Sequence, residues 1–267
     1  MSEVSKTAHW GVSWVAVTGA SRGLGAAICE GVAGVVDSGS LILGLARSSQ
    51  GLNDTAHKVQ QTNPNVKFIP VVMDLEKASK EDLEKVLGEY LKVGQDPAPT
   101  RSIIFHNAGS LGDLVYLRNH KDSDHINSYF TLNISSVVLL NAVFLEMVSQ
   151  LPDVAVEIVN ISSLCAIQPF KSWSLYCAAK AARDMLFKVL AAEEPKLMVL
   201  NYAPGPLDND MQELARSETA DDEMRLMFAS LKEEGKLLAC SVSVNKLLEV
   251  LKKRQFKSGD HVDYYDA

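Results

Sequence analysis

Short apolar runs alternate with longer amphipathic segments along this chain, and the runs have the length of strands. The clearest runs lie at residues 14–18, 40–46, 66–73 and 101–106, and further runs follow at residues 154–161, 196–202 and 261–265. Continuous apolar runs of this kind are typical of strands buried on both faces of a parallel sheet. Pro70 interrupts the third run and weakens its assignment, because proline cannot donate a hydrogen bond to a neighbouring strand.

The segments between the runs repeat their apolar positions with the period of a helix. They predict helices over residues 25–36, 52–61, 79–92, 132–150, 172–194 and 247–253. Ser79 fits the N-cap position of the third helix, and Asp82 is placed to complete a capping pair. Residues 95–100 indicate a surface loop, and the charge-rich residues 206–238 indicate a partly helical flap.

This alternation is typical of a Rossmann-type α/β fold, a doubly wound parallel sheet with helices on both faces. No linker, repeat or low-complexity segment divides the chain, so we expect one domain over residues 1–267 with residues 206–238 as a substrate flap. Ligands in such folds bind outside the carboxyl ends of the strands. The residues that follow the apolar runs are therefore the candidates for function.

Charge and apolar content narrow the class of protein. The 267-residue chain has a net charge of −7 and a pI near 5.4, which argues against a nucleic-acid partner because such proteins normally carry a basic stripe. The first residues are polar, and no run approaches the roughly 18 apolar residues of a membrane span. We therefore expect a soluble cytoplasmic protein without membrane contact.

The cysteines are Cys29, Cys165, Cys177 and Cys240, and none forms a CxxC pair or a metal-ligand spacing. We expect no metal site. The even number is compatible with two disulfides, but the length of the chain and the lack of a secretory signal favour reduced thiols packed as small apolar side chains.

A glycine-rich turn follows the first predicted strand and opens a helix, with the sequence Thr18-Gly-Ala-Ser-Arg-Gly-Leu-Gly25. Gly19 permits a tight turn, while Gly23 and Gly25 allow a pyrophosphate to approach the backbone at the helix N-terminus. The spacing differs from the G-x-G-x-x-G pattern of many dinucleotide sites. The alternative is a tight strand–helix turn without a ligand.

The end of the second strand indicates which nucleotide would bind. An acidic residue there would bind the ribose 2′-hydroxyl of NAD, but the chain reads Leu45-Ala-Arg-Ser-Ser49. Arg47, together with Arg22 in the glycine turn, would suit the 2′-phosphate of NADP. The alternative for both arginines is a solvated surface position.

Two further strand ends carry candidate nucleotide contacts. Asp74 would accept a hydrogen bond from the adenine amino group, or else caps the turn that follows it. Asn107-Ala-Gly109 would lie along the adenine ribose, or else forms a turn at the sheet edge.

Tyr176 and Lys180 are spaced four residues apart, so a helix places them on one face. An ammonium group beside a phenol favours the phenolate and lowers the phenol pKa from its usual value near ~10. Such a pair is suited to move a proton to or from a carbonyl oxygen. The alternative is a packed aromatic ring and a lysine whose stem covers apolar surface.

The ordered set of these motifs resembles the short-chain dehydrogenase/reductase family over essentially the whole chain. The motifs that carry the resemblance are the Thr18–Gly25 turn, Asn107-Ala-Gly109, Asn133, Ser163, Tyr176-x3-Lys180 and Pro204-Gly205. The resemblance implies an oxidoreductase in which NADPH gives a hydride to a carbonyl carbon and Tyr176 protonates the oxygen. Ser163 would position that oxygen, Lys180 would also bind the nicotinamide ribose, and Asn133 would hold a water that links Lys180 to solvent.

The resemblance also implies nucleotide contacts and an assembly. The implied nucleotide contacts are Gly19, Ser21, Arg22, Gly23, Leu24, Gly25, Arg47, Ser48, Asp74, Leu75, Asn107, Ala108, Gly109, Tyr176, Lys180, Pro204, Gly205 and Leu207. Members of the family usually dimerise, so we expect a homodimer. Two residues depart from the family pattern without removing a reacting group, so they bear on how the activity is tuned. His106 replaces a common asparagine, and Ala179 replaces a common glycine.

A narrower set of motifs resembles the members of this family that reduce side-chain carbonyls of pterins. It includes Asn160-Ile-Ser-Ser-Leu-Cys165, Lys180-Ala-Ala-Arg-Asp-Met185, Tyr202-Ala-Pro-Gly-Pro-Leu207 and His261-Val-Asp263. This resemblance implies sepiapterin or 6-pyruvoyl-tetrahydropterin as substrate, in the final step of tetrahydrobiopterin biosynthesis. The implied substrate contacts are Ser163, Leu164, Cys165, Tyr176, Gly205, Met211 and Asp263, with Trp173 also near the ring.

Asp263 would anchor the amino-pyrimidine, although an exposed acid in a charged tail is the alternative. Two other functions stay open: a general carbonyl or ketone reductase, and a non-catalytic nucleotide-binding protein.

Overall fold

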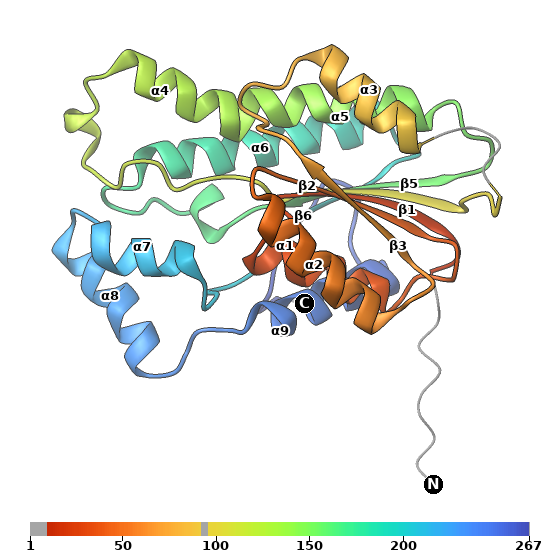
Figure 1. Ribbon diagram of the computed structural model, residues 1–267. Helices are drawn as coiled ribbons and strands as arrows, with labels where there is room; N and C mark the ends of the chain where they lie inside the picture. The colour runs from red at the N-terminus through yellow and green to blue at the C-terminus, as the bar shows by residue number, and fades with distance from the viewer. Residues whose placement is uncertain (1–9, 92–95, 267) are drawn as a thin grey trace, which may run out of the picture.

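The computed structural model describes residues 10–91 and 96–266. Within these residues the strands form one parallel sheet of seven strands in the order β3-β2-β1-β4-β5-β6-β7 (Figure 1). The strands are β1 Ser13–Thr18, β2 Leu41–Ala46, β3 Lys67–Val72, β4 Arg101–His106, β5 Ala155–Ile161, β6 Met198–Ala203 and β7 His261–Asp263. The predicted Rossmann-type α/β fold is therefore confirmed.

Helices cover both faces of this sheet. Their bounds are α1 Gly23–Ala33, α2 Ser49–Thr62, α3 Lys80–Tyr90, α4 Ser123–Phe130, α5 Ser136–Val148, α6 Ser174–Glu193, α7 Asp210–Glu218, α8 Asp222–Glu233 and α9 Cys240–Lys253. In Figure 1, α1, α2 and α9 lie on one face, and α3, α5 and α6 lie on the other. The short helices α7 and α8 lie together beyond the carboxyl end of β6.

Two apolar cores explain this layering. Alternate residues of β1 point to opposite faces, so Val15 and Val17 pack with Ile28 of α1, while Trp14 packs on the other face with Phe144 of α5. The central strands are buried along their whole length, as continuous apolar runs predict. Pro70 is tolerated because β3 is an edge strand that, among the described residues, pairs only with β2.

Several element boundaries differ from the sequence-based expectation. The helical run expected to begin near residue 132 begins at Ser123, because the Asp122 side chain accepts hydrogen bonds from the backbone amides of Asp124 and His125 and caps it. The last helix begins at Cys240 rather than at residue 247. The capping pair of Ser79 and Asp82 on α3 is confirmed, while the expected end of that helix at residue 92 and the start of the loop at residue 95 lie outside the described residues.

The run from Ser123 to Val148 corrects a further expectation. It is 26 residues long, with a mean hydropathy of 1.7 in its most apolar window, so by length and composition alone it is apolar enough to cross a membrane. Leu140, Val143 and Phe144 of this run are buried in the core against the sheet. Packing against the sheet accounts for the apolar character of α5.

The strand order reverses beside β1, which pairs with β2 on one side and with β4 on the other. In doubly wound sheets the crevice for a ligand opens at such a switch point, outside the carboxyl ends of the strands. Here Thr18 and His106 end the two strands that flank the crevice.

Candidate active site

The glycine turn between β1 and α1 leaves the N-terminus of α1 open. Gly19 and Gly23 have φ values of +69° and +54°, which favour glycine, and a Cβ on Gly25 would stand 2.2 Å from the carbonyl oxygen of Gly19. No side chain caps α1, and its first turn contains no acidic residue. Its first backbone amides therefore suit an anion such as a pyrophosphate.

The loop after β4 is fastened to this turn. The Thr18 hydroxyl accepts hydrogen bonds from the backbone amides of Asn107 and Ala108, each at 2.9 Å. The Asn107 side-chain amide donates to the carbonyl oxygen of Thr18 at 2.8 Å. A Cβ on Gly109 would stand 2.9 Å from the Asn133 side-chain oxygen, so the loop also meets the helix that carries Asn133.

The two arginines proposed to select NADP lie at the surface. Arg47 is exposed at the end of β2, and the next residue, Ser48, caps α2 by accepting a hydrogen bond from the amide of Gly51. Arg22 forms an ion pair at 2.6 Å with Asp210 at the start of α7. Both partners are largely exposed, so this pair is weak and leaves Arg22 available for a stronger anion.

The remaining nucleotide candidates take structural positions in the turns. The Asp74 side chain accepts a hydrogen bond from the amide of Glu76 at 3.2 Å and so caps the turn after β3. Leu75 is buried in the core. Ser21 packs against the start of α2, where a Cβ on Gly51 would stand 2.5 Å from the Ser21 carbonyl oxygen.

Tyr176 and Lys180 share one face of α6, as predicted. The Lys180 ammonium nitrogen lies 5.5 Å from the centroid of the Tyr176 ring and donates a 2.7 Å hydrogen bond to the carbonyl oxygen of Ile161 at the end of β5. Both side chains are buried. The fold thus holds the pair at the carboxyl end of the central strands.

Ser163 and Asn133 lie on neighbouring segments. Ser163 follows β5 as the N-cap of a short 3₁₀ turn and accepts a hydrogen bond from the amide of Cys165. Its hydroxyl is also near enough to Tyr176 to act on the pKa of that phenol. Asn133 lies within a π-helical segment between α4 and α5, where its side chain accepts from the amide of Ser110 at 3.0 Å. It therefore lies inside the helical run rather than at its N-cap.

The expected lowering of the Tyr176 pKa by Lys180 is wrong for this geometry. Burial raises the pKa of Tyr176 well above its usual value, and the hydrogen bond from Ser163 and the positive charge of Arg183 oppose that rise. Burial also lowers the pKa of Lys180 to about 7, and Arg183 adds to this effect. Desolvation dominates because both groups are enclosed by the core.

The two departures from the family pattern have packing explanations. His106 is buried, with its Nε2 atom 3.1 Å from the Asn141 side-chain oxygen, and burial lowers the pKa of His106 to about 3. It is therefore a neutral core histidine. Ala179 is buried in a small apolar cluster with Tyr129 and Leu175, where its methyl group is accommodated.

Residues of α7 and α8 pack against the side of the site near Tyr176. Cys165, Trp173 and Tyr176 form an apolar cluster, against which Met211 of α7 and Phe228 of α8 pack. The ring of Phe228 stacks on Trp173 with centroids 4.8 Å apart. The Trp173 indole also donates a 3.1 Å hydrogen bond to the Thr219 hydroxyl, whereas Leu164 is exposed.

The last strand, β7, ends at Asp263, which lies at the same carboxyl end of the sheet as the groups described above. Asp263 pairs in register with Ala203, directly before Pro204 and Gly205. Gly205 has a φ of +73°, and a Cβ there would stand 3.4 Å from the Cβ of Tyr264. Leu207 is buried and forms a bridge to Leu238. Asp263 is half-buried, and its side chain accepts a hydrogen bond from the amide of Tyr265 at 3.0 Å.

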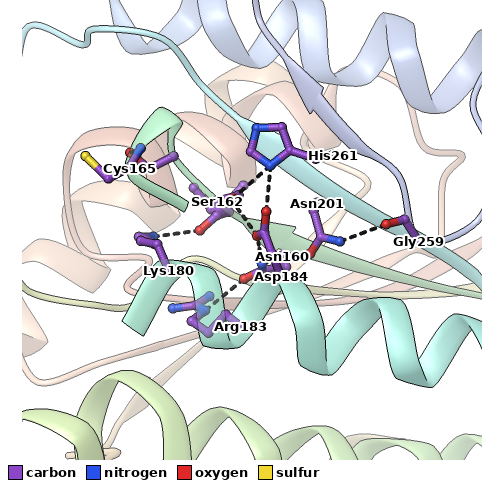
Figure 2. A network of polar contacts seen from close by, with 11 residues as sticks. Asn160, Ser162, Cys165, Lys180, Arg183, Asp184, Asn201, Gly259 and His261 are labelled. Carbon is purple, nitrogen blue, oxygen red and sulfur yellow. Dashed lines mark hydrogen bonds and ion pairs between the residues drawn. The ribbon is translucent and has the colours of Figure 1, made fainter. Parts of the chain in front are cut away.

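Sequence reasoning missed a buried polar network below these groups (Figure 2). Arg183 donates to the Asn160 side chain, to the carbonyl oxygen of Ala108 at 3.0 Å and to that of His106. Asp184, the next residue, faces His261 of β7. The signal was present, because both charges follow Lys180 by three and four residues and so share its buried face.

The described residues contain neither a disulfide nor a cluster of metal ligands. All four cysteines are free thiols, so the two-disulfide alternative is wrong. Among residues 10–91 and 96–266, no group of three or more histidine, cysteine or acidic side chains could hold a metal ion.

Comparisons with known proteins show the family to which the chain belongs. Residues 13–220 match the family described as short chain dehydrogenase. Sepiapterin reductase from Mus musculus is 42% identical over 251 residues, covering 94% of this chain and 95% of the relative. Sepiapterin reductase from Bos taurus is 38% identical and covers 98% of each chain.

A solved short-chain dehydrogenase/reductase from Saccharomyces cerevisiae has a TM-score of 0.80 at 26% identity, and covers 96% of this chain and 97% of that chain. The chain belongs to the short-chain dehydrogenase family.

Proposed function

We propose that this protein reduces carbonyl groups on the side chain of a pterin, such as sepiapterin or 6-pyruvoyl-tetrahydropterin, with NADPH as reductant, in the final step of tetrahydrobiopterin biosynthesis. One observation carries the proposal: an open glycine turn, the Tyr176–Lys180 pair, Ser163 and Asp263 all lie at the carboxyl ends of the strands of one sheet. The similarity to sepiapterin reductases over nearly the whole chain supports the same substrate class.

The nucleotide end of the site fits NADPH. The open N-terminus of α1 and the close approach at Gly25 suit a pyrophosphate, and the end of β2 offers exposed Arg47 in place of an acid. When bound, the reduced nicotinamide would supply the hydride. Arg22 and Arg47 would bind the 2′-phosphate, since guanidinium groups form forked hydrogen bonds with phosphate.

The chain's own residues would handle the proton. Tyr176 gives a proton to the developing alkoxide, and Ser163 hydrogen-bonds the same oxygen and orients it. Lys180 lies beside the phenol ring and, when protonated, provides a positive charge that favours the phenolate form of Tyr176. Asn133, close to the loop at Gly109, would hold a water that connects Lys180 to solvent.

The substrate end of the site fits a flat ring with polar edges. Trp173, Cys165 and Met211 give it an apolar wall, and Asp263 offers a carboxylate for adjacent N–H donors of a pterin. We propose that residues 206–238 are the substrate flap of a single domain. The contact of Phe228 with Trp173 supports this role.

Substitution of the proton donor tests the proposed chemistry. Tyr176→Phe should lower kcat for sepiapterin reduction at least about a hundredfold, because phenylalanine keeps the ring but lacks the hydroxyl that gives the proton. NADPH binding, measured by fluorescence titration, should be retained. Tyr90→Phe on α3 is the matched control and should keep full turnover. Undiminished turnover in Tyr176→Phe would remove the proton-donor assignment.

Substitution of the anchor tests the substrate class. Asp263→Ala should raise the KM for sepiapterin on the order of tenfold or more, because a bidentate charged contact is lost, and leave the KM for NADPH nearly unchanged. A simple diketone serves as the comparison substrate. Equal use of diketone and sepiapterin, or an equal rise in both KM values, would favour a general carbonyl reductase instead.

We also propose that the protein is a homodimer. Met185, Leu186 and Val189 on α6 and Val138 on α5 are large apolar side chains that stay exposed, which supports burial against a second copy. Met185→Glu should halve the mass measured by light scattering, whereas Val242→Glu on α9 should not. A monomeric wild-type protein would contradict the proposal.

A cytoplasmic location is the last part of the proposal. The four free thiols suit a reducing compartment, because cytosolic proteins keep their cysteines reduced. Cell fractionation that finds the protein outside the cytoplasm would overturn it.

A further inference from the structure

Arg183 and Asp184 are adjacent residues of opposite charge buried on α6, in the turn that follows Lys180 (Figure 2). Buried charges are costly unless they are fully paired. Arg183 is directed to the carbonyl groups at the end of β4, which lie on the nucleotide side of the site. Asp184 is directed the other way, towards β5 and β7.

The Asp184 carboxylate accepts from three donors. The Ser162 hydroxyl lies 2.5 Å from Oδ1, the Asn160 side-chain amide lies 3.1 Å from Oδ1, and His261 Nδ1 lies 2.6 Å from Oδ2. Because a carboxylate only accepts, His261 donates through Nδ1. The exposed fraction of the side chain is 10% for His261 and 5% for Asp184, so this contact is shielded from solvent.

His261 belongs to a strand that has little backbone support. Strand β7 contains three residues and, within the part of the chain that the structure describes, pairs only with β6 at the edge of the sheet. The Asn201 side chain adds a bond to the carbonyl oxygen of Gly259 just before the strand. The contact between His261 and Asp184 therefore joins this short strand directly to the helix that carries Tyr176.

Side chains two residues apart on a strand point to the same face. His261 and Asp263 thus share the face of β7 on which α6 packs. Fixing the His261 ring on Asp184 fixes the place of the Asp263 carboxylate relative to the Tyr176 hydroxyl. The positions of the Asp263 carboxylate and the Tyr176 hydroxyl both affect the rate, because a misplacement of about 1 Å can lower it on the order of a hundredfold.

We propose that His261 is a positioning residue: its contact with Asp184 locks β7 onto α6 and sets the separation between the Asp263 anchor and the Tyr176 proton donor. This inference rests on the proposed function, because it assigns a role to the carboxylate that would hold the pterin. His261 itself touches neither substrate nor cofactor in this role.

Steady-state kinetics with sepiapterin and NADPH test the proposal. His261→Leu should raise the KM for sepiapterin about tenfold and leave the KM for NADPH within about twofold, because the nucleotide side is held by other contacts. His261→Asn should restore the wild-type KM, since its side-chain amide occupies the place of Nδ1. His261→Gln, whose amide lies farther out, should not. His57→Leu, on the exposed face of α2, is the matched control.

A double-mutant cycle separates positioning from general stability. Asp263→Asn should raise the KM for sepiapterin by itself, and adding His261→Leu should then produce little further change. Additive effects of the two substitutions, or an equal rise in both KM values, would overturn the proposal. If His261→Leu does not fold by circular dichroism, His261→Gln takes its place in the cycle.

The same assays separate this inference from the proposed function. A wild-type enzyme that does not reduce sepiapterin contradicts the proposed function, and the inference falls with it. An active wild type together with an unchanged sepiapterin KM in His261→Leu contradicts the inference alone.

Discussion

At the scale of single residues, the glycine turn shows how one missing Cβ opens a binding site. A Cβ on Gly25 would stand 2.2 Å from the Gly19 carbonyl oxygen, which belongs to backbone and cannot swing away. Gly25→Ala should therefore force the turn apart and weaken NADPH binding on the order of a hundredfold, measured by fluorescence titration.

Gly34 at the other end of α1 supplies the control for that measurement. It has helical backbone angles, and a Cβ there would meet its nearest atom at an ordinary 3.4 Å. Gly34→Ala should leave NADPH binding unchanged and should not lower stability, because alanine restricts the unfolded chain more than glycine does. Equal binding by the two alanine variants would contradict the assigned role of the turn.

Whether the role of a residue could be predicted from the sequence depended on whether its partners lie nearby in the chain. The spacing of Tyr176 and Lys180 was readable because a helix alone fixes which residues share a face. The buried face of Arg183 and Asp184 could be predicted from their spacing to Lys180, but their partners could not, because these lie on β4, β5 and β7, which only the folded sheet brings together. The sign of the Tyr176 pKa shift failed for the same reason, since it depends on burial rather than on spacing.

At the scale of elements, α7 and α8 depend on the site for their own packing. No residue of α8 is fully buried, and Phe228 contacts the flap side of the site by stacking on Trp173. Phe228→Ala should therefore loosen the flap and raise the KM for sepiapterin severalfold, with a smaller effect on NADPH.

Leu226 provides the matched control on the same helix, since 67% of its surface is exposed. Leu226→Ala should keep both KM values. If Phe228→Ala also keeps the wild-type KM for sepiapterin, the flap does not enclose the substrate and its assignment is wrong.

Element boundaries followed the sequence closely wherever burial was uniform. The strand β4 was predicted residue for residue because residues 102–106 are buried on both faces and polar residues flank the strand. The start of the helical run at Ser123 escaped prediction because the apolar stripe of α4 is short, consisting of Ile126, Tyr129 and Phe130, and its first turn is polar. Such a helix start is recognised by its cap, and here Asp122 is that cap.

At the scale of the whole molecule, the strand order decides which distant residues meet. Alternating strands and helices predict a parallel sheet, but not that β1 pairs with both β2 and β4. That order places the glycine turn beside the loop at Asn107, where the Thr18 hydroxyl joins them. The same order puts β7 at one edge of the sheet, so the end of β5, which holds Lys180, lies between the glycine turn after β1 and Asp263 on β7.

The buried lysine should leave a signature in the stability of the whole protein. In the unfolded chain Lys180 has its usual pKa of 10.5, whereas burial lowers it to about 7 in the fold. Between those values the unfolded chain binds a proton that the folded protein does not, so this group makes the free energy of unfolding rise with pH. Below about pH 7 both states are protonated and the contribution is constant.

Comparing the stability of wild type with that of a Lys180 variant isolates the contribution of Lys180, because the contributions of the other titrating groups cancel in the difference. From pH 7 to pH 9, wild type should gain stability relative to Lys180→Met on the order of 1 kcal/mol per pH unit at the steepest point, measured by urea denaturation. Lys188→Met, an exposed position on the same helix, should parallel wild type. Parallel curves for Lys180→Met and wild type would mean that Lys180 stays charged in the fold, and the burial of the proton-donor pair would then need a compensating anion close to the amine.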